Sequence, residues 1–242
     1  MPHRLIEPHD FGGVFCLDPD PAVGRKVRNS ADARLRRLKR RNPCHVVGAR
    51  IRTKLELGDP LGPLLVEHCG GFDFDYAPDR VLGDGEAIEI GGELLVAVAT
   101  PGHTSNHLCF GWRGALFTGD HIMAWSTTVV VPPDGDMGDY MASLDKLRGR
   151  DDRAYYPAHG PAVTNPQQLV RGMIGHRMQR ERQILKRLDA GDRTIPEIVA
   201  AAYPGLDLRL VPAAGASVTA HLLDLERRGL VMRGEGETWT TK

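Results

Sequence analysis

Three apolar runs in this chain each end in a short loop that presents a histidine or an aspartate. The first loop carries His103 after the run LLVAVA, the second carries Asp120 after ALFT, and the third carries His159 after AYYP. A glycine stands beside each of these side chains, and glycine allows the backbone to turn sharply. Because the ends of neighbouring strands gather ligands at one edge of a sheet, this pattern favours folds in which three strand ends meet.

Imidazole and carboxylate groups are the ligands that a borderline cation such as zinc accepts at roughly 2.0–2.2 Å. A single histidine after a strand is usually a surface or hydrogen-bonded residue, and a single Gly-Asp is usually a turn. Three such loops in one chain are much harder to explain in that way. The pattern therefore predicts a metal site that contains His103, Asp120 and His159.

Strand-like and helix-like patterns alternate from about Phe72 onward. Short apolar runs separated by glycine turns predict successive strands, and Asp139–Leu147 has helical spacing. This alternation indicates a mixed α/β sheet domain, which we place at residues 73–170. The predicted strands are Val81–Leu82, Ala87–Ile90, Leu94–Ala99, Leu108–Trp112, Ala115–Thr118 and Ala154–Tyr156.

Residues 171–242 have a different pattern, in which three helices precede a two-stranded hairpin. The second helix has the clearest start, because Thr194 is followed by a proline and then by Glu197, as in a capping box. Three helices and a hairpin in this order predict a winged-helix domain. The predicted helices span Gly175–Leu188, Thr194 to about Tyr203, and Ala216–Arg228, and the hairpin spans Leu230–Thr240.

Taken together, the stretches TPGHTSNHLCF, LFTGDHI and YPAHGP resemble the second half of the metallo-β-lactamase fold, as in glyoxalase II-like and β-lactamase-like protein 2-like hydrolases. The resemblance implies an α/β fold, an αββα sandwich followed by a small winged-helix domain. It also implies that His103 ligates a first zinc ion, Asp120 bridges two metals and His159 ligates the second. His107 and His121 match no ligand position, and we expect them to orient a ligand or to pack structurally.

One motif of the resembled family is missing from this chain. Family members carry H-x-H-x-D-H upstream of the TPGHT stretch, and that motif supplies two ligands to each metal. This chain contains no His-x-His, and the fragment nearest to the motif is His9–Gly13. Three protein ligands and a water suffice for a catalytic zinc, but His103, Asp120 and His159 belong to two different metal shells in the family. We therefore expect weakened metal binding and impaired activity.

Residues 1–72 form an atypical basic segment with little sustained apolar period, and Arg34–Arg41 holds six positive charges in eight positions. The family's opening strands are not recognisable there. Two explanations compete: the segment has diverged, or it is a misassigned reading frame of a gene whose intact product carries the motif. We favour the second, because the family-like pattern begins abruptly near Phe72. If neither other frame of the upstream DNA encodes H-x-H-x-D-H, the frame explanation is rejected.

Composition narrows the remaining function classes. Thirty-one basic and thirty-one acidic residues cancel, which argues against a dedicated polyanion binder, and a hydrophobic fraction of 41% is typical of a folded globular chain. No apolar run approaches the ~18 residues of a membrane helix, and the first residues lack the apolar run of a signal peptide. Because the cysteines are scattered without a C-x-x-C pair, we expect reduced thiols in a cytoplasmic protein. The cysteines are Cys16, Cys44, Cys69 and Cys109.

The leading hypothesis is a metal-dependent hydrolase in which one or two zinc ions activate a water that cleaves an ester, a thioester or a phosphodiester. A second hypothesis is a catalytically degenerate remnant that keeps the fold but binds little metal. A third is a winged-helix protein that binds RNA, with endoribonuclease-like cleavage. From Arg171 onward the chain carries twelve Lys and Arg against nine Asp and Glu. That small excess supports RNA binding only weakly, since nucleic-acid-binding domains usually carry a clear basic face.

Overall fold

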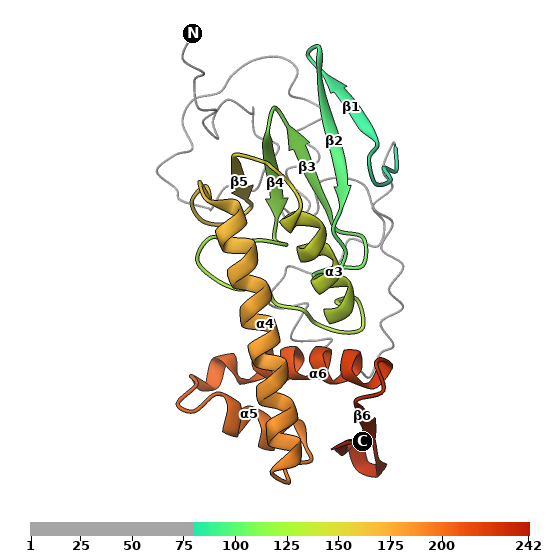
Figure 1. Cartoon of the computed structure of the whole chain (residues 1–242), viewed down its shortest axis with the longest axis vertical. Coiled ribbons are helices and arrows are strands. Elements are labelled where there is room, and N and C mark those ends of the chain that lie inside the picture. Colours follow the sequence, from blue (N-terminus) through green and yellow to red (C-terminus); the bar gives the residue numbers. More distant parts are fainter. Residues whose placement is uncertain (1–79) are drawn as a thin grey trace.

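The first part of the described structure contains five short strands and one helix, and the helix lies between the fourth and fifth strands. The structure is a computed structural model that describes residues 80–242, so the predicted basic segment 1–72 lies outside the described residues. The strands form one sheet in the order β1-β2-β3-β4-β5 (Figure 1). The elements are β1 Ala87–Ile90, β2 Glu93–Ala99, β3 Leu108–Trp112, β4 Ala115–Gly119, α3 Met137–Arg148 and β5 Ala154–Pro157.

The first four strands form an antiparallel meander because tight turns connect β1 to β2 and β3 to β4. Gly91 and Gly92 both have positive φ, and so do Arg113 and Gly114, which is the backbone conformation of a two-residue hairpin turn. β5 then runs parallel to β4, after the crossover through α3. The predicted strands are confirmed except for Val81–Leu82, which is not part of a strand. The Leu82 side chain is buried in the same apolar cluster as Ala97.

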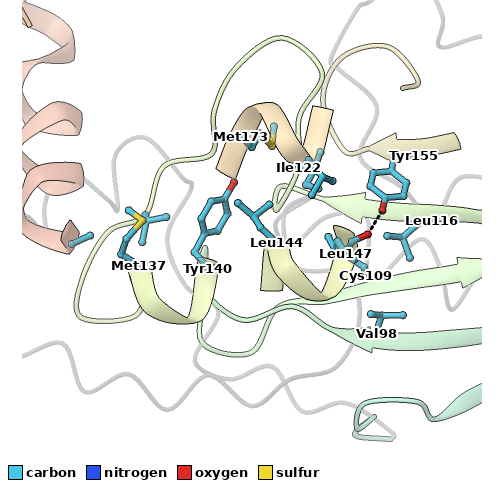
Figure 2. Packing of buried hydrophobic residues seen from close by; sticks show 13 residues of the cluster. Val98, Cys109, Leu116, Ile122, Met137, Tyr140, Leu144, Leu147, Tyr155 and Met173 are labelled. Atoms are coloured by element: carbon cyan, nitrogen blue, oxygen red, sulfur yellow. Dashed lines mark hydrogen bonds between the residues drawn. The ribbon is translucent and has the colours of Figure 1, made fainter. Parts of the chain in front are cut away.

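One face of the sheet packs against two helices (Figure 2). Leu116 and Tyr155 from the strands meet Leu144 and Leu147 from α3, and all four side chains are fully buried. The hydroxyl group of Tyr155 donates a hydrogen bond to the carbonyl oxygen of Leu147 at 3.3 Å. The described residues therefore supply one sheet and one helical layer of the predicted αββα sandwich.

The winged-helix order predicted for the C-terminal residues is confirmed. Thr194 accepts a hydrogen bond from the Glu197 amide while the Glu197 carboxylate accepts one from the Thr194 amide, so the predicted capping box is present. β6 and β7 pair as an antiparallel hairpin. The elements are α4 Pro166–Asp189, α5 Ile195–Ala202, α6 Val211–Arg227, β6 Val231–Arg233 and β7 Trp239–Thr241, with short 3₁₀ turns at Leu208–Leu210 and Glu235–Glu237.

α4 belongs to both halves of the described structure and runs from the sheet layer to the winged helix (Figure 1). Val170 and Met173 pack with the sheet core, whereas Ile184 and Leu188 pack inside the winged-helix core. The helix begins earlier than the predicted Gly175, and the predicted boundary between residues 170 and 171 lies inside it. Within residues 80–242, no helix combines the length and the apolar character needed to span a membrane.

Candidate metal centre

Asp120 and His159 stand at the ends of two parallel strands that lie side by side. β4 and β5 pair in a register that puts Gly119 opposite Pro157, and the Ala158 amide donates to the carbonyl oxygen of Gly119 at 2.9 Å. The two loops therefore leave the same edge of the sheet. The Nε2 atom of His159 lies 3.6 Å from the Oδ1 atom of Asp120.

The Oδ1 atom of Asp120 is buried and makes no hydrogen bond within the described residues. A buried carboxylate oxygen without a donor is costly, so a site of this kind favours a proton, a water or a cation. The nearby imidazole of His159 is a second donor of the type that zinc accepts. These two atoms fit one side of a metal coordination shell.

His103 lies in the loop after β2, and a backbone contact fixes its ring. Its Nδ1 atom lies 2.7 Å from the carbonyl oxygen of Val129. Because a carbonyl oxygen only accepts hydrogen bonds, Nδ1 is the donor in this contact, and in the neutral ring the lone pair then lies on Nε2. A histidine held by a backbone carbonyl in this way is typical of metal ligands.

His107 and His121 form a row of rings behind these side chains. The ring centroids of His103 and His107 lie 6.3 Å apart, those of His107 and His121 lie 5.4 Å apart, and Tyr140 packs 4.7 Å from His121. Burial, with a smaller contribution from the charge of His103, lowers the pKa of His107 to about 3. Burial also lowers the pKa of His121 well below its usual value, so both rings are neutral at pH 7. A Cβ atom at Gly119 would lie 2.8 Å from the Nε2 atom of His107, so only glycine lets this ring approach the turn before Asp120.

The described residues do not complete a metal site by themselves. Among residues 80–242, no three or more His, Cys, Asp or Glu side chains come close enough together to hold a metal ion. The structure thus brings Asp120 and His159 together and places His103 on another loop, where its Nδ1 contact orients the ring. Further ligands have to come from water, from substrate or from outside the described range.

Sequence reasoning missed the residues that hold the turn after Asp120. The side chain of Thr128, the hydroxyl group of Tyr140 and the guanidinium of Arg177 all contact this region. The helical spacing of α4 could have identified one of these residues, Arg177. The buried positions Val170, Met173, Ile184 and Leu188 define one face of that helix, and Arg177 falls on the same face.

Comparison with known proteins defines the class of this chain. The family model described as "Metallo-beta-lactamase superfamily" matches residues 33–159, and the model described as "Beta-lactamase associated winged helix domain" matches residues 194–239. Because the first match covers more than half of the chain, the protein belongs to the metallo-beta-lactamase superfamily, and it carries the associated winged helix. The first match begins inside the segment whose reading frame is in question.

Individual relatives give the same result. The chain is 41% identical over 106 residues to "Beta-lactamase-like protein 2 homolog" of Caenorhabditis elegans. The aligned region covers 43% of this chain and 34% of that protein. The chain is 38% identical over 117 residues to "Atrochrysone carboxyl ACP thioesterase" of Aspergillus fumigatus, which covers 46% of this chain and 36% of the relative. The chain therefore spans about a third of the length of these curated relatives.

Solved structures confirm the fold. A metallo-beta-lactamase family protein from Thermus thermophilus superposes with a TM-score of 0.60 at 27% identity, over 69% of this chain and 55% of that one. A beta-lactamase domain protein from Burkholderia ambifaria superposes with a TM-score of 0.62 at 20% identity, over 70% of this chain and 55% of that one. The predicted metallo-β-lactamase fold with a C-terminal winged helix is confirmed.

Proposed function

We propose that this protein is a metal-dependent hydrolase that cleaves the thioester of an apolar acyl group. The observation that supports it best is the pair formed by Asp120 and His159, in which a buried carboxylate oxygen without a hydrogen-bond donor lies 3.6 Å from an imidazole nitrogen. Members of the superfamily typically bind metal ions, and imidazole and carboxylate are suitable ligands for zinc.

His103, Asp120 and His159 are the described residues that would hold such a metal. A zinc ion bound there would supply a Lewis acid and a water whose pKa is lowered toward about 7. The protein's own part is to position the ligands. The paired strand ends position Asp120 and His159, and the Val129 carbonyl orients the ring of His103 through its Nδ1 atom.

A thioester with an apolar acyl group is supported by two observations. The first is the similarity to a relative whose name states that it is a thioesterase for an acyl carrier protein substrate. The second is a hollow of about 300 Å³ beside the site, between the segment after Asp120 and α4. The largest apolar side chains that line this hollow are those of Met123, Trp125, Leu169 and Met173.

One close contact connects the hollow to the loop that carries His159. A Cβ atom at Gly160 would lie 2.4 Å from the Cδ1 atom of Trp125, so the indole ring packs against the residue that follows His159. An acyl chain in the hollow would therefore lie close to Gly160, the residue next to His159. The hollow is shallow and open to solvent, and its lining is mainly apolar, which suits an acyl chain lying along the surface.

The competing proposal is a remnant that keeps the fold but binds little metal, and the missing H-x-H-x-D-H motif supports it. Elemental analysis after purification in zinc-supplemented buffer separates the two. Each missing protein ligand lowers the zinc-binding free energy, so a remnant should bind little zinc. Less than ~0.2 zinc per chain therefore rejects the metal-dependent hydrolase. Hydrolysis of an acyl-pantetheine thioester, followed by thiol release, then tests the substrate class; activity on phosphodiesters alone would contradict it.

A further inference from the structure

The helix α4, which joins the sheet layer to the winged helix, makes a buried polar contact with the segment that follows Asp120. Arg177 of α4 is only 3% exposed, and its Nη2 atom donates a hydrogen bond to the carbonyl oxygen of Thr128. The same guanidinium lies over the ring of Tyr140, with its carbon atom 5.1 Å from the ring centroid. Arg177 therefore fixes the backbone of Thr128 relative to α4.

Thr128 passes this constraint to the Asp120 turn. Its hydroxyl group lies 2.5 Å from the carbonyl oxygen of Asp120 and 3.0 Å from that of His121, so it donates to one or both. The hydroxyl group of Tyr140 donates to the same His121 carbonyl at 3.1 Å. Two of the residues that contact Arg177 thus hold the backbone at and after Asp120.

A second contact links the winged helix to the loop that carries His103. Arg227 of α6 forms a 2.7 Å ion pair with Asp136, whose amide donates to the carbonyl oxygen of Gly102 at 2.9 Å. Gly102 immediately precedes His103. Because the Arg227 side chain is half-exposed, this ion pair is a weaker constraint than the buried contact of Arg177.

The environment of Arg177 is unusual for a residue that only packs. No ion pair joins it to a carboxylate within residues 80–242, and its Nε atom is buried without a hydrogen-bond partner. A buried charge without a partner of opposite charge opposes folding, and an apolar residue would suit this face of α4 better. Arginine adds directional bonds at this position: Nη2 donates to the Thr128 carbonyl, and Nη1 donates to the hydroxyl group of Ser217 on α6 at 3.5 Å.

We propose that the winged helix serves as a clamp on the metal-site loops and that Arg177 is a positioning residue for Asp120. The proposal rests on the proposed function, since it assigns Asp120 to a metal site. Four arginines of the C-terminal part pair with nearby acidic groups and are therefore not free to form an open basic face. These pairs are Arg187–Asp192, Arg209–Asp207, Arg227–Asp136 and Arg228–Glu181.

The test compares Arg177→Met with a matched control, Arg180→Met. Arg180 also lies on α4, stacks over Tyr203 with its guanidinium carbon 3.8 Å from the ring centroid, and donates to the carbonyl oxygen of Ala202, but it does not contact the Asp120 turn. Amide hydrogen exchange of the peptides that cover residues 119–130 is measured in the full chain. We expect at least tenfold faster exchange in Arg177→Met and no change there in Arg180→Met.

Zinc affinity supplies the second measurement. Arg177→Met should weaken zinc binding about tenfold, whereas Arg180→Met should leave it unchanged even where both variants lose the same amount of thermal stability. Arg177→Lys should restore part of the affinity, because an ammonium group can still donate to the Thr128 carbonyl. Equal exchange rates in the two methionine variants, or unchanged zinc affinity in Arg177→Met, would overturn the positioning role.

Two further features keep the test decisive. If the wild-type chain binds no zinc, the proposed function fails, and hydrogen exchange alone still decides whether the clamp exists. If Arg177→Met does not fold, Thr128→Val replaces it, with Thr219→Val as the control because that hydroxyl group bonds only within α6. Faster exchange near His121 in Thr128→Val but not in Thr219→Val supports the link from Thr128 to the Asp120 turn on which the clamp depends, and equal rates in the two variants reject the clamp.

Discussion

The Nε2 atom of His159 lies 3.6 Å from the Oδ1 atom of Asp120, and backbone hydrogen bonds between two strands place these residues at neighbouring strand ends. The strand pairing therefore fixes the backbone at both residues of the pair. Preorganised donor atoms cost little rearrangement on metal binding, whereas a pair that depended on flexible side chains would lose binding free energy to ordering.

Asp120→Asn should remove zinc binding while preserving the fold. The substitution keeps the size of the side chain but removes the negative charge from the buried Oδ1 position, and a neutral amide is a poor zinc ligand. We expect zinc content in elemental analysis to fall at least tenfold, and His159→Ala should have the same effect. Zinc content equal to that of the wild type in either variant would show that the substituted residue is not a zinc ligand.

His121→Ala provides the contrasting case. His121 is fully buried between the rings of His107 and Tyr140, so its removal should lower the thermal unfolding temperature. The folded fraction should still bind zinc, because neither ring nitrogen of His121 is expected to be a ligand. Equal loss of zinc in His121→Ala and Asp120→Asn would contradict the assignment of ligands.

The strand ends that carry His103, Asp120 and His159 could be predicted because each follows an apolar run with a glycine turn. Their relative placement could not, because the parallel pairing of β4 with β5 depends on how the α3 crossover packs on the sheet. Local sequence determines where a strand ends, whereas tertiary packing determines its neighbour. The pattern of strand ends therefore predicts that Asp120 and His159 share a site, but it does not identify their strands as neighbours.

The start of α4 and the role of Arg177 were missed for a related reason. The first turns of α4 pack on the sheet core and its last turns pack in the winged helix, so no single amphipathic pattern covers the whole helix. A charged residue on a buried helix face is the signal that points to Arg177. Its partner, the Thr128 carbonyl, is a backbone atom that no sequence pattern identifies.

Gly102→Ala should strongly destabilise the protein. Gly102 has a φ of +131°, and a Cβ atom there would lie 2.3 Å from the Cα atom of Tyr140, which is backbone and cannot move aside easily. Strain of this kind costs about 2 kcal/mol or more. Urea unfolding of the variant should therefore show a clearly lower midpoint than that of the wild type.

Gly175→Ala is the matched control for this prediction. Gly175 lies inside α4 with ordinary helical φ, and a Cβ atom there would contact nothing within 4 Å. Alanine should stabilise the helix by about 0.5–1 kcal/mol. A lower unfolding free energy for Gly175→Ala, or an unchanged one for Gly102→Ala, would show that the backbone geometry described for these two sites is wrong.

Thr194→Ala should lower the free energy of unfolding by about 1 kcal/mol. The substitution removes the acceptor for the Glu197 amide at the start of α5, and N-cap threonines typically contribute that amount. Thr219→Ala is the comparison, because its hydroxyl group bonds to a carbonyl within α6 and caps nothing. Chemical denaturation should show the larger loss for Thr194→Ala; equal losses would argue against the capping box as a stabilising feature.

Acid should destabilise the protein partly through His221 of α6, whose ring is only 2% exposed and has no hydrogen-bond partner on either nitrogen within the described residues. Burial, with smaller contributions from Arg177, Arg180, His176 and Arg228, lowers the pKa of His221 to about 3. The unfolded chain binds the proton near pH 6.5 and the folded chain does not. Stability is therefore full above pH 6.5 and is lost as the pH falls toward 3.

His221→Leu should remove this acid sensitivity. The difference in unfolding free energy between His221→Leu and the wild type should shift by about 2 kcal/mol in favour of the variant between pH 7.5 and pH 5. Other titrating groups affect both proteins equally and cancel in that difference. His176→Gln should produce a smaller shift, because His176 is exposed. A difference that stays constant from pH 7.5 to pH 5 would show that His221 accepts a proton in the folded state as readily as in the unfolded chain.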